Sequence, residues 1–125
     1  MGAVLISIKP EYVKRIASGE KRFEFRKRIF NRQVDKAVVY ASSPVRRVVG
    51  EFDVGQIIEG SPGAVWERCR FAAGIDKVRF MRYFDGCDIA FAIPIEEYRS
   101  YIPPKNISDF GVVPPQSYCY LSATY

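Results

Sequence analysis

The stretch from Ser18 to Arg28 concentrates the side chains of this sequence whose types and spacing could do chemistry. It places a lysine, a glutamate and an arginine at Lys21, Glu24 and Arg26. Exposed ion pairs contribute only about 0–1 kcal/mol to stability, so an anionic ligand explains this concentration of charge better than stability does. The planar guanidinium of Arg26 suits a phosphate or a base edge. We therefore expect this stretch to line an anion-binding site.

Lys21 and Glu24 each allow more than one role. Lys21 could contact a phosphate, or act as a nucleophile or proton acceptor if burial and neighbouring cations lower its pKa. An exposed lysine at a turn is the simpler alternative. Glu24 could pair with Arg22 and Arg26, orient Arg26, or accept a hydrogen bond from the exocyclic amine of a cytosine-like base. If the chain is an enzyme, we expect Lys21 and Glu24 to be its catalytic residues.

The same stretch alternates as a half-buried strand does. Phe23 and Phe25 share one face of the expected strand, while Arg22, Glu24 and Arg26 share the other. We expect the aromatic face to enter the core and the charged face to border a cleft.

Residue types that are missing or scattered limit the chemistry. The sequence contains no histidine, which excludes Ser-His-Asp and Cys-His hydrolysis and histidine-ligated zinc. Its three cysteines, Cys69, Cys87 and Cys119, are widely spaced and form no Cys-x-x-Cys pair. We expect reduced thiols, a cytoplasmic protein, no bound metal and no organic cofactor.

Positive charge is concentrated in the first part of the chain. Residues 1–47 hold twelve Lys/Arg and four Asp/Glu, a net charge of +8, and the remainder holds seven against ten, a net charge of −3. This asymmetry favours a basic surface that meets nucleic acid, although a merely solvated basic face is an equal alternative.

The elements that must position these residues follow from periodicity and turn signals. A helix begins at Pro10 and ends at Gly19, where a left-handed residue suits the turn. Further helices are expected from Ser61 to Gly74 and from Asp76 to Gly86. Expected strands are Val4–Ile8, Arg22–Arg26, Lys36–Ala41, Arg46–Val54 with a continuation through Gly55–Glu59, Asp88–Ile95, Tyr98–Ile102 and Tyr118–Ala123.

This order predicts an α+β fold, a small mixed β-barrel with two or three short flanking helices, because strands outnumber helices and cluster. A length of 125 residues predicts a single domain, 1–125. No apolar run is long enough to span a bilayer, and the N-terminus does not resemble a secretory signal. The segment from Pro103 to Ser117 is expected to be a long loop, which favours a functional role.

Other residues are expected near a ligand. Ser42 and Ser43 could donate hydrogen bonds from a turn or only satisfy its backbone. The long loop offers Gln116 and Ser117 for recognising a base edge, and Tyr118 for stacking, with the barrel core as the alternative for Tyr118. Four further arginines are expected to contact a nucleic-acid backbone: Arg28, Arg32, Arg46 and Arg47.

Three segments carry a resemblance to a known family. Gly19-x-Lys21-x-x-Glu24-x-Arg26, which follows a short helix and opens a strand, resembles the signature of the ASCH domain. The segments Tyr40–Pro44 with Val49–Phe52, and Pro114–Tyr118, resemble prokaryotic and phage-type stand-alone members of that family. The resemblance implies a PUA-like β-barrel that binds RNA or a modified nucleotide in a cleft lined by the signature residues.

The resemblance also implies alternatives in which the chain is an enzyme. One branch of the family is a metal-independent amidohydrolase that acts on N4-acetylcytidine, and other members are described as nucleases. In the amidohydrolase branch a hydroxyl residue occupies the position of Glu24, so this sequence departs from that pattern. We predict a nucleic-acid-binding module, with RNA or a modified nucleoside or nucleotide as its partner, and keep hydrolysis of an N-acylated nucleoside or of RNA as the alternative. A third alternative is an adaptor whose basic face meets a protein.

Overall fold

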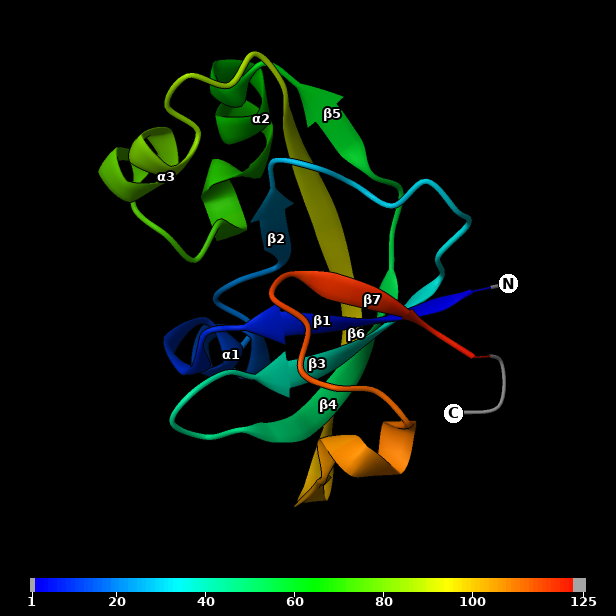
Figure 1. Cartoon of the computed structure of the whole chain (residues 1–125). Coiled ribbons are helices and arrows are strands. Elements are labelled where there is room, and N and C mark those ends of the chain that lie inside the picture. The colour runs from blue at the N-terminus through cyan, green and yellow to red at the C-terminus, as the bar shows by residue number, and fades with distance from the viewer. Residues whose placement is uncertain (1, 123–125) are drawn as a thin grey trace.

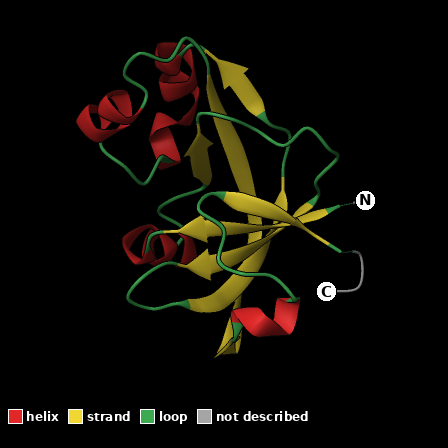
Figure 2. Ribbon diagram, in the orientation of Figure 1, coloured by secondary structure: helices red, strands yellow, loops and turns green. Residues whose placement is uncertain are grey.

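The computed structural model describes residues 2–122 (Figure 1), and in that range it is a mixed α+β structure (Figure 2). Two 3₁₀ helices, η1 (Arg70–Ala72) and η2 (Ile107–Phe110), accompany the longer elements. These are β1 (Ala3–Ile8), α1 (Pro10–Ala17), β2 (Phe23–Arg26), β3 (Lys36–Ala41), β4 (Arg47–Val54), β5 (Ile58–Gly60), α2 (Pro62–Cys69), α3 (Lys77–Tyr83), β6 (Ala90–Lys105) and β7 (Tyr118–Leu121).

The strands of the described range form one sheet in the order β2-β6-β4-β3-β1-β7, and β5 pairs with β6 beside this path. Within residues 2–122, only β1 and β3 pair in parallel, and the other pairs are antiparallel. The sheet curls into a half-barrel, with α1 beside its middle strands and α2 and α3 beside β2 and β5 (Figure 1). The predicted α+β, barrel-like fold with short flanking helices is confirmed.

The helices begin where the sequence predicts. Pro10 lies in the first turn of α1. Ser61 accepts a hydrogen bond from the Ala64 N–H at the start of α2, and Asp76 accepts one from the Arg79 N–H at the start of α3. The expected helix from Ser61 to Gly74 is interrupted, however, because the chain tightens into η1 after α2.

The two strands predicted at Asp88–Ile95 and Tyr98–Ile102 are one long strand, β6, so the division between them was wrong. Glu97 adopts a φ of 50°, which makes a local irregularity that the pairing with β4 absorbs before the strand continues. The strand also extends through Pro103 and Pro104, which were predicted to open the loop. The rest of that loop contains η2.

The predicted continuation of β4 through Gly55–Glu59 was also wrong. The Gly55 N–H donates to the Pro94 carbonyl, and the chain then leaves β4 and pairs with β6 as β5. At the other end of the chain, β7 ends at Leu121, and position 123 of the predicted Tyr118–Ala123 strand lies outside the described residues.

Two apolar clusters support the region between the helices and the sheet. One packs α2 and α3 onto β2 and β6, and it includes Phe25, Phe80 and Phe84. The other packs α1 onto the inner face of the sheet, and it includes Ile16 and Phe52. The two clusters fix α1 and α3 on either side of β2, which is the arrangement that shapes the site. No helix in the described range is long and apolar enough to cross a membrane.

Candidate functional site

A cavity of about 490 Å³ lies between the start of α1, strand β2 and helix α3. Its position follows from the chain path, because Gly19 ends α1 at a φ of 85° and turns the chain directly into β2. The charged stretch therefore lies beneath α1 and faces α3. The lining residues are Ser7, Ile8, Lys9, Tyr12, Lys21, Glu24, Phe25, Arg26, Ser42, Ile75, Arg79, Phe80, Arg82, Tyr83 and Gln116.

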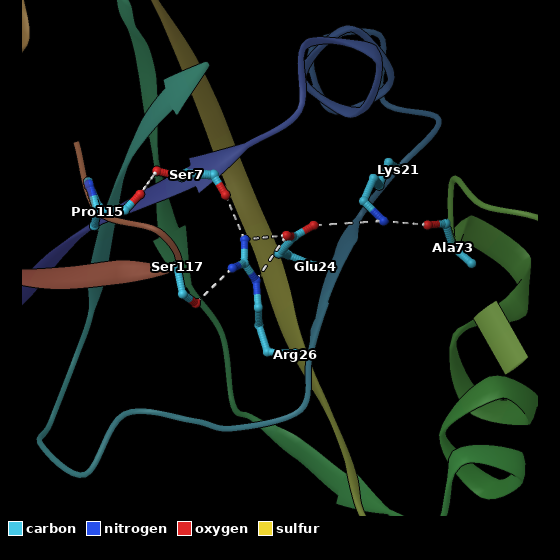
Figure 3. Close-up of polar contacts among 7 residues, drawn as sticks. All are labelled: Ser7, Lys21, Glu24, Arg26, Ala73, Pro115 and Ser117. Atoms are coloured by element: carbon cyan, nitrogen blue, oxygen red, sulfur yellow. Dashed lines mark hydrogen bonds and ion pairs between the residues drawn. The ribbon is translucent and has the colours of Figure 1, made fainter. Parts of the chain in front are cut away.

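Lys21 is buried, with only 3% of its side chain exposed. Its Nζ donates to the Ala73 carbonyl at 2.9 Å and lies 3.9 Å from Glu24 Oε1 (Figure 3). The ammonium also lies 5.2 Å from the ring centre of Tyr12 and 4.8 Å from that of Phe25. Burial lowers the pKa of Lys21, and the nearby Glu24 carboxylate opposes that effect.

Arg26 holds Glu24 and two other parts of the chain together. Glu24 Oε2 accepts hydrogen bonds from Arg26 Nε at 3.1 Å and Nη2 at 2.6 Å. Arg26 also donates to the Ser7 carbonyl at 2.9 Å and to Ser117 Oγ at 3.0 Å, and Ser7 Oγ donates to the Pro115 carbonyl at 2.6 Å (Figure 3). Glu24 therefore lies between Lys21 and Arg26, and most of the hydrogen-bonding groups of Arg26 are bonded to other parts of the chain.

The burial of β2 differs from the predicted alternation on one point. Phe23 and Phe25 are buried, as predicted, and Arg22 is exposed. Lys21 and Glu24 are buried as well, whereas the simpler alternative for Lys21 was an exposed lysine at a turn. The reason is that the segment before α3 covers Lys21 at Ala73, while Ser7 and Ser117 lie against the Glu24–Arg26 pair, so these charges are desolvated and pair with one another.

The remaining predicted ligand residues divide into two groups. Ser42 and Gln116 line the cavity with the signature residues, and Ser117 reaches Arg26. Ser43 is exposed and is not among the described residues that line the cavity. Tyr118 packs edge-to-face on Phe30 at 5.0 Å, within the apolar cluster beneath α1.

The four arginines predicted to contact a nucleic-acid backbone are exposed, and none is among the described residues that line the cavity. Arg32 lies over the ring of Tyr120 at 4.1 Å. Arg47 donates to the Arg46 carbonyl at 3.0 Å. Arg28 lies in the segment between β2 and β3. Their contact with a nucleic-acid backbone stays a prediction.

Sequence reasoning missed the contribution of α1 and α3 to the cavity. Arg79, Arg82 and Tyr83 stand at positions i, i+3 and i+4, which is the spacing of one helix face. The spacing could be recognised in the sequence. Only the fold, however, shows that this face of α3 meets Tyr12 and Lys9 across the cavity. Among the described residues, five cations and one carboxylate line the cavity, so the electrostatic potential there is positive.

Other groups in the described chain offer less for covalent or metal chemistry. Burial raises the pKa of Cys69 to about 11, so this thiol stays protonated near neutral pH. Among residues 2–122, no three His, Cys, Asp or Glu side chains lie close enough together to hold a metal ion. The chemically distinctive groups of the cavity are therefore the buried Lys21–Glu24–Arg26 set and the cations of its rim.

Comparison with known proteins identifies a family whose match includes the Gly19–Arg26 stretch. The family model described as the ASCH domain matches residues 6–114. An ASCH domain-containing ribonuclease of Zymomonas mobilis is 31% identical over 123 residues, which covers 94% of this chain and 82% of that protein. The large ribosomal subunit protein uL22 of Ureaplasma parvum is 28% identical over 94% of this chain, which spans 39% of that protein.

Solved structures agree in fold over nearly the whole chain. The crystal structure of ASCH from Zymomonas mobilis matches with a TM-score of 0.88 and 29% identity, covering 98% of this chain and 89% of that one. A mutant form of the Zymomonas protein matches with a TM-score of 0.87 and 28% identity, covering 97% and 91%. The chain belongs to the ASCH domain family.

Proposed function

We propose that this chain binds RNA and holds one unpaired nucleotide in the cavity between α1, β2 and α3. The observation that carries the proposal is the cavity itself, which is positive, partly aromatic and about 490 Å³ in volume. Ligand pockets for small organic molecules have volumes of roughly 300–1,000 Å³, so a nucleotide fits this size. The 31% identical relative from Zymomonas mobilis is named a ribonuclease, which supports RNA as the ligand class.

The walls of the cavity suit a base and its polar edge. Tyr12 and Tyr83 offer aromatic surface against which an unstacked base can pack. Ser42 and Gln116 offer polar groups near the base edge. Recognition of a flipped or unpaired base ordinarily combines these two kinds of contact.

The signature residues have a specific part in this proposal. Arg26 directs four of its five N–H groups at protein acceptors, so it orients Glu24 and shapes the floor. Lys21 and Glu24 present a buried charged pair to the cavity. We propose that this pair reads polar groups of the base, with Arg26 as its positioning residue.

The test measures binding of a fluorescent single-stranded RNA of about ten nucleotides by anisotropy. We expect affinity to fall as salt rises between about 50 and 200 mM, because bound phosphates release counterions. Replacing Tyr83 by Ala should weaken binding at least about five-fold, since loss of one stacking contact costs roughly 1–3 kcal/mol. The matched control is Val78→Ala, an exposed residue of the same helix that does not line the cavity.

Two results would contradict the RNA proposal. One is the absence of measurable RNA binding at low salt by folded protein. The other is equal affinity of the Tyr83→Ala and Val78→Ala variants for the RNA, because the nucleotide would then lie outside the cavity.

RNA cleavage is a second candidate function, and two observations favour it. The relative named as a ribonuclease covers most of this chain, and the buried Lys21 has a lowered pKa beside Glu24. A lowered pKa makes the neutral amine of a lysine more accessible, and the neutral amine can accept a proton from an attacking hydroxyl. In this candidate function Lys21 is the general base, and Glu24 is the second catalytic residue.

Cleavage is tested by following end-labelled RNA on a denaturing gel with wild type and with Lys21→Met and Glu24→Gln, whose folding is checked by near-ultraviolet circular dichroism. We expect both variants to lose cleavage while they keep a native spectrum. If the RNA stays intact with the wild-type protein, cleavage is ruled out and RNA binding remains as the proposed function. A parallel reaction with N4-acetylcytidine, followed by absorbance, tests the amidohydrolase alternative, which stays a prediction.

A further inference from the structure

The rim of the cavity at α1 and α3 carries three cations that lie outside the signature: Lys9, Arg79 and Arg82. We propose that they form a phosphate subsite, and that Glu11 competes with the incoming phosphate for Arg79. This inference rests on the proposed RNA binding and deepens it, because it assigns the phosphate of the bound nucleotide to the α1–α3 rim. The ligand class is therefore a phosphate ester, held by residues that the signature does not contain.

Among the described residues, two of the three cations make no direct contact with a protein partner, although Lys9 lies near enough to Glu11 to help lower the pKa of that carboxyl. Within residues 2–122, the side chains of Lys9 and Arg82 make no hydrogen bond, ion pair or ring contact, although both line the cavity. Arg82 stands one helical turn beyond Arg79, so the two guanidinium groups project from the same face of α3. Arginine binds phosphate through its planar fork, and a lysine nearby adds a point charge.

The third cation, Arg79, already binds an anionic group. Its Nη2 lies 3.3 Å from Glu11 Oε1, and its guanidinium lies 5.4 Å from the ring centre of Tyr12. This ion pair joins α1 to α3 beside the cavity. The Glu11 carboxylate thus occupies Arg79 in the way that a phosphate oxygen would.

The cations of the signature are less suited to a phosphate. Arg26 keeps only one of its five N–H groups beyond those bonded to Glu24, Ser7 and Ser117. Lys21 is almost fully buried and donates to Ala73. A phosphate, which keeps much of its hydration, is more easily accommodated at the exposed rim than on the buried floor.

The proposal predicts opposite effects for two substitutions. Arg82→Gln removes a phosphate donor, so phosphate binding should weaken at least about three-fold. Glu11→Gln removes the competing carboxylate, so binding should strengthen about two- to five-fold, in line with the small strength of an exposed ion pair. The matched control is Arg68→Gln, an exposed arginine of α2 that does not line the cavity, for which no change is expected.

The experiment titrates inorganic phosphate at constant ionic strength and follows the arginine Nε–Hε signals by nuclear magnetic resonance. We expect saturable shifts of the Arg79 and Arg82 signals, with the order of affinity Glu11→Gln above wild type above Arg82→Gln. The subsite would be overturned if the shifts of the Arg79 and Arg82 signals did not saturate with phosphate, or if the Arg68 signal shifted by the same amount. A Glu11→Gln variant with unchanged or weaker binding would overturn the competition.

A second arm distinguishes the source of the phosphate. Single-stranded RNA and the four nucleoside 5′-monophosphates are compared as competitors of inorganic phosphate at equal nucleotide concentration. If RNA displaces inorganic phosphate at the lower concentration, the subsite binds the backbone of a strand. If the monophosphates do so at the lower concentration, the subsite binds a free nucleotide. Displacement by neither would overturn the proposal.

The result also separates this inference from the RNA proposal. RNA binding that depends on Tyr83 but is unaffected by Arg82→Gln and Glu11→Gln would overturn the subsite alone. Saturable phosphate binding without RNA binding would overturn the RNA proposal and leave a phosphate subsite for another ligand.

Discussion

Arg26 connects three segments of the chain through a single side chain. It bonds to Glu24 within β2, to the Ser7 carbonyl in β1, and to Ser117 before β7. Only 13% of the Arg26 side chain and 11% of the Glu24 side chain are exposed, so each charge depends on the other. Removing one partner of a buried ion pair leaves the other charge desolvated and unpaired.

Replacing Arg26 by Ala should therefore lower the free energy of unfolding by about 2–4 kcal/mol, because Glu24 would keep only Lys21 as a neighbouring cation. Urea unfolding followed by tryptophan fluorescence measures this loss. Arg22→Ala is the matched control, since Arg22 is an exposed arginine of the same stretch. We expect the control to change stability by less than about 0.5 kcal/mol. A similarly small loss for Arg26→Ala would show that the network does not support the fold.

At the scale of elements, a second charged network joins the central strands. Glu51 of β4 accepts hydrogen bonds from Arg99 at 2.7 Å and Tyr101 at 2.7 Å, both on β6, and pairs with Lys36 of β3 at 3.2 Å. Burial alone would raise the pKa of Glu51. The bonds from Tyr101, Arg99 and Lys36 outweigh that effect and lower the pKa to about 2.

This network predicts a pH dependence of stability with a definite sign. The folded-state pKa of Glu51 lies below its ordinary value of 4.5, so its contribution is present above that value and is lost as pH falls toward about 2. We expect the Glu51→Gln variant to lose less stability than the wild type as the pH falls from 4.5 to about 2. The measurement is the urea midpoint as a function of pH for both proteins. Parallel profiles would contradict the assignment to Glu51.

At the scale of the whole molecule, the segment between η1 and α3 bonds the α2–α3 region to the half-barrel beside the cavity, in addition to the apolar cluster that packs these helices onto β2 and β6. The carbonyls of Ala72, Ala73 and Gly74 accept hydrogen bonds from the Arg22 N–H, Lys21 Nζ and Arg15 Nη1. Gly74 has a φ of 66°, and a Cβ there would lie 2.3 Å from the Cβ of Lys21. The close approach of this segment to Lys21 therefore requires glycine.

Replacing Gly74 by Ala should be more damaging than the same change at Gly86. Gly86 also has a positive φ, 79°, but a Cβ there would meet no atom within 4 Å. The control isolates the backbone cost of about 1 kcal/mol, and we expect Gly74→Ala to cost at least about 1 kcal/mol more. Thermal unfolding measures both costs. Hydrogen exchange should show greater opening of α2 and α3 in the Gly74→Ala variant, and equal effects at the two sites would contradict the role of this contact.

The sequence by itself determined much of this protein, because local signals govern local structure. Helix starts at Pro10, Ser61 and Asp76 depend on the neighbouring backbone, and so they were predictable. The spacing of the signature from Gly19 to Arg26 indicated the family, which the family match confirms. Alternation in β2 correctly placed Phe23 and Phe25 in the core.

Only the tertiary structure decided which distant segments meet. The continuity of β6 depends on its pairing with β4, which carries it past Glu97 and into the two prolines that suggest a loop. The burial of Lys21 depends on the Ala73 segment, which lies 52 residues away in sequence. The contribution of Arg79 to the cavity likewise depends on the packing of α3 beside α1. These features are set by packing between elements, and periodicity within one element carries no information about its neighbours.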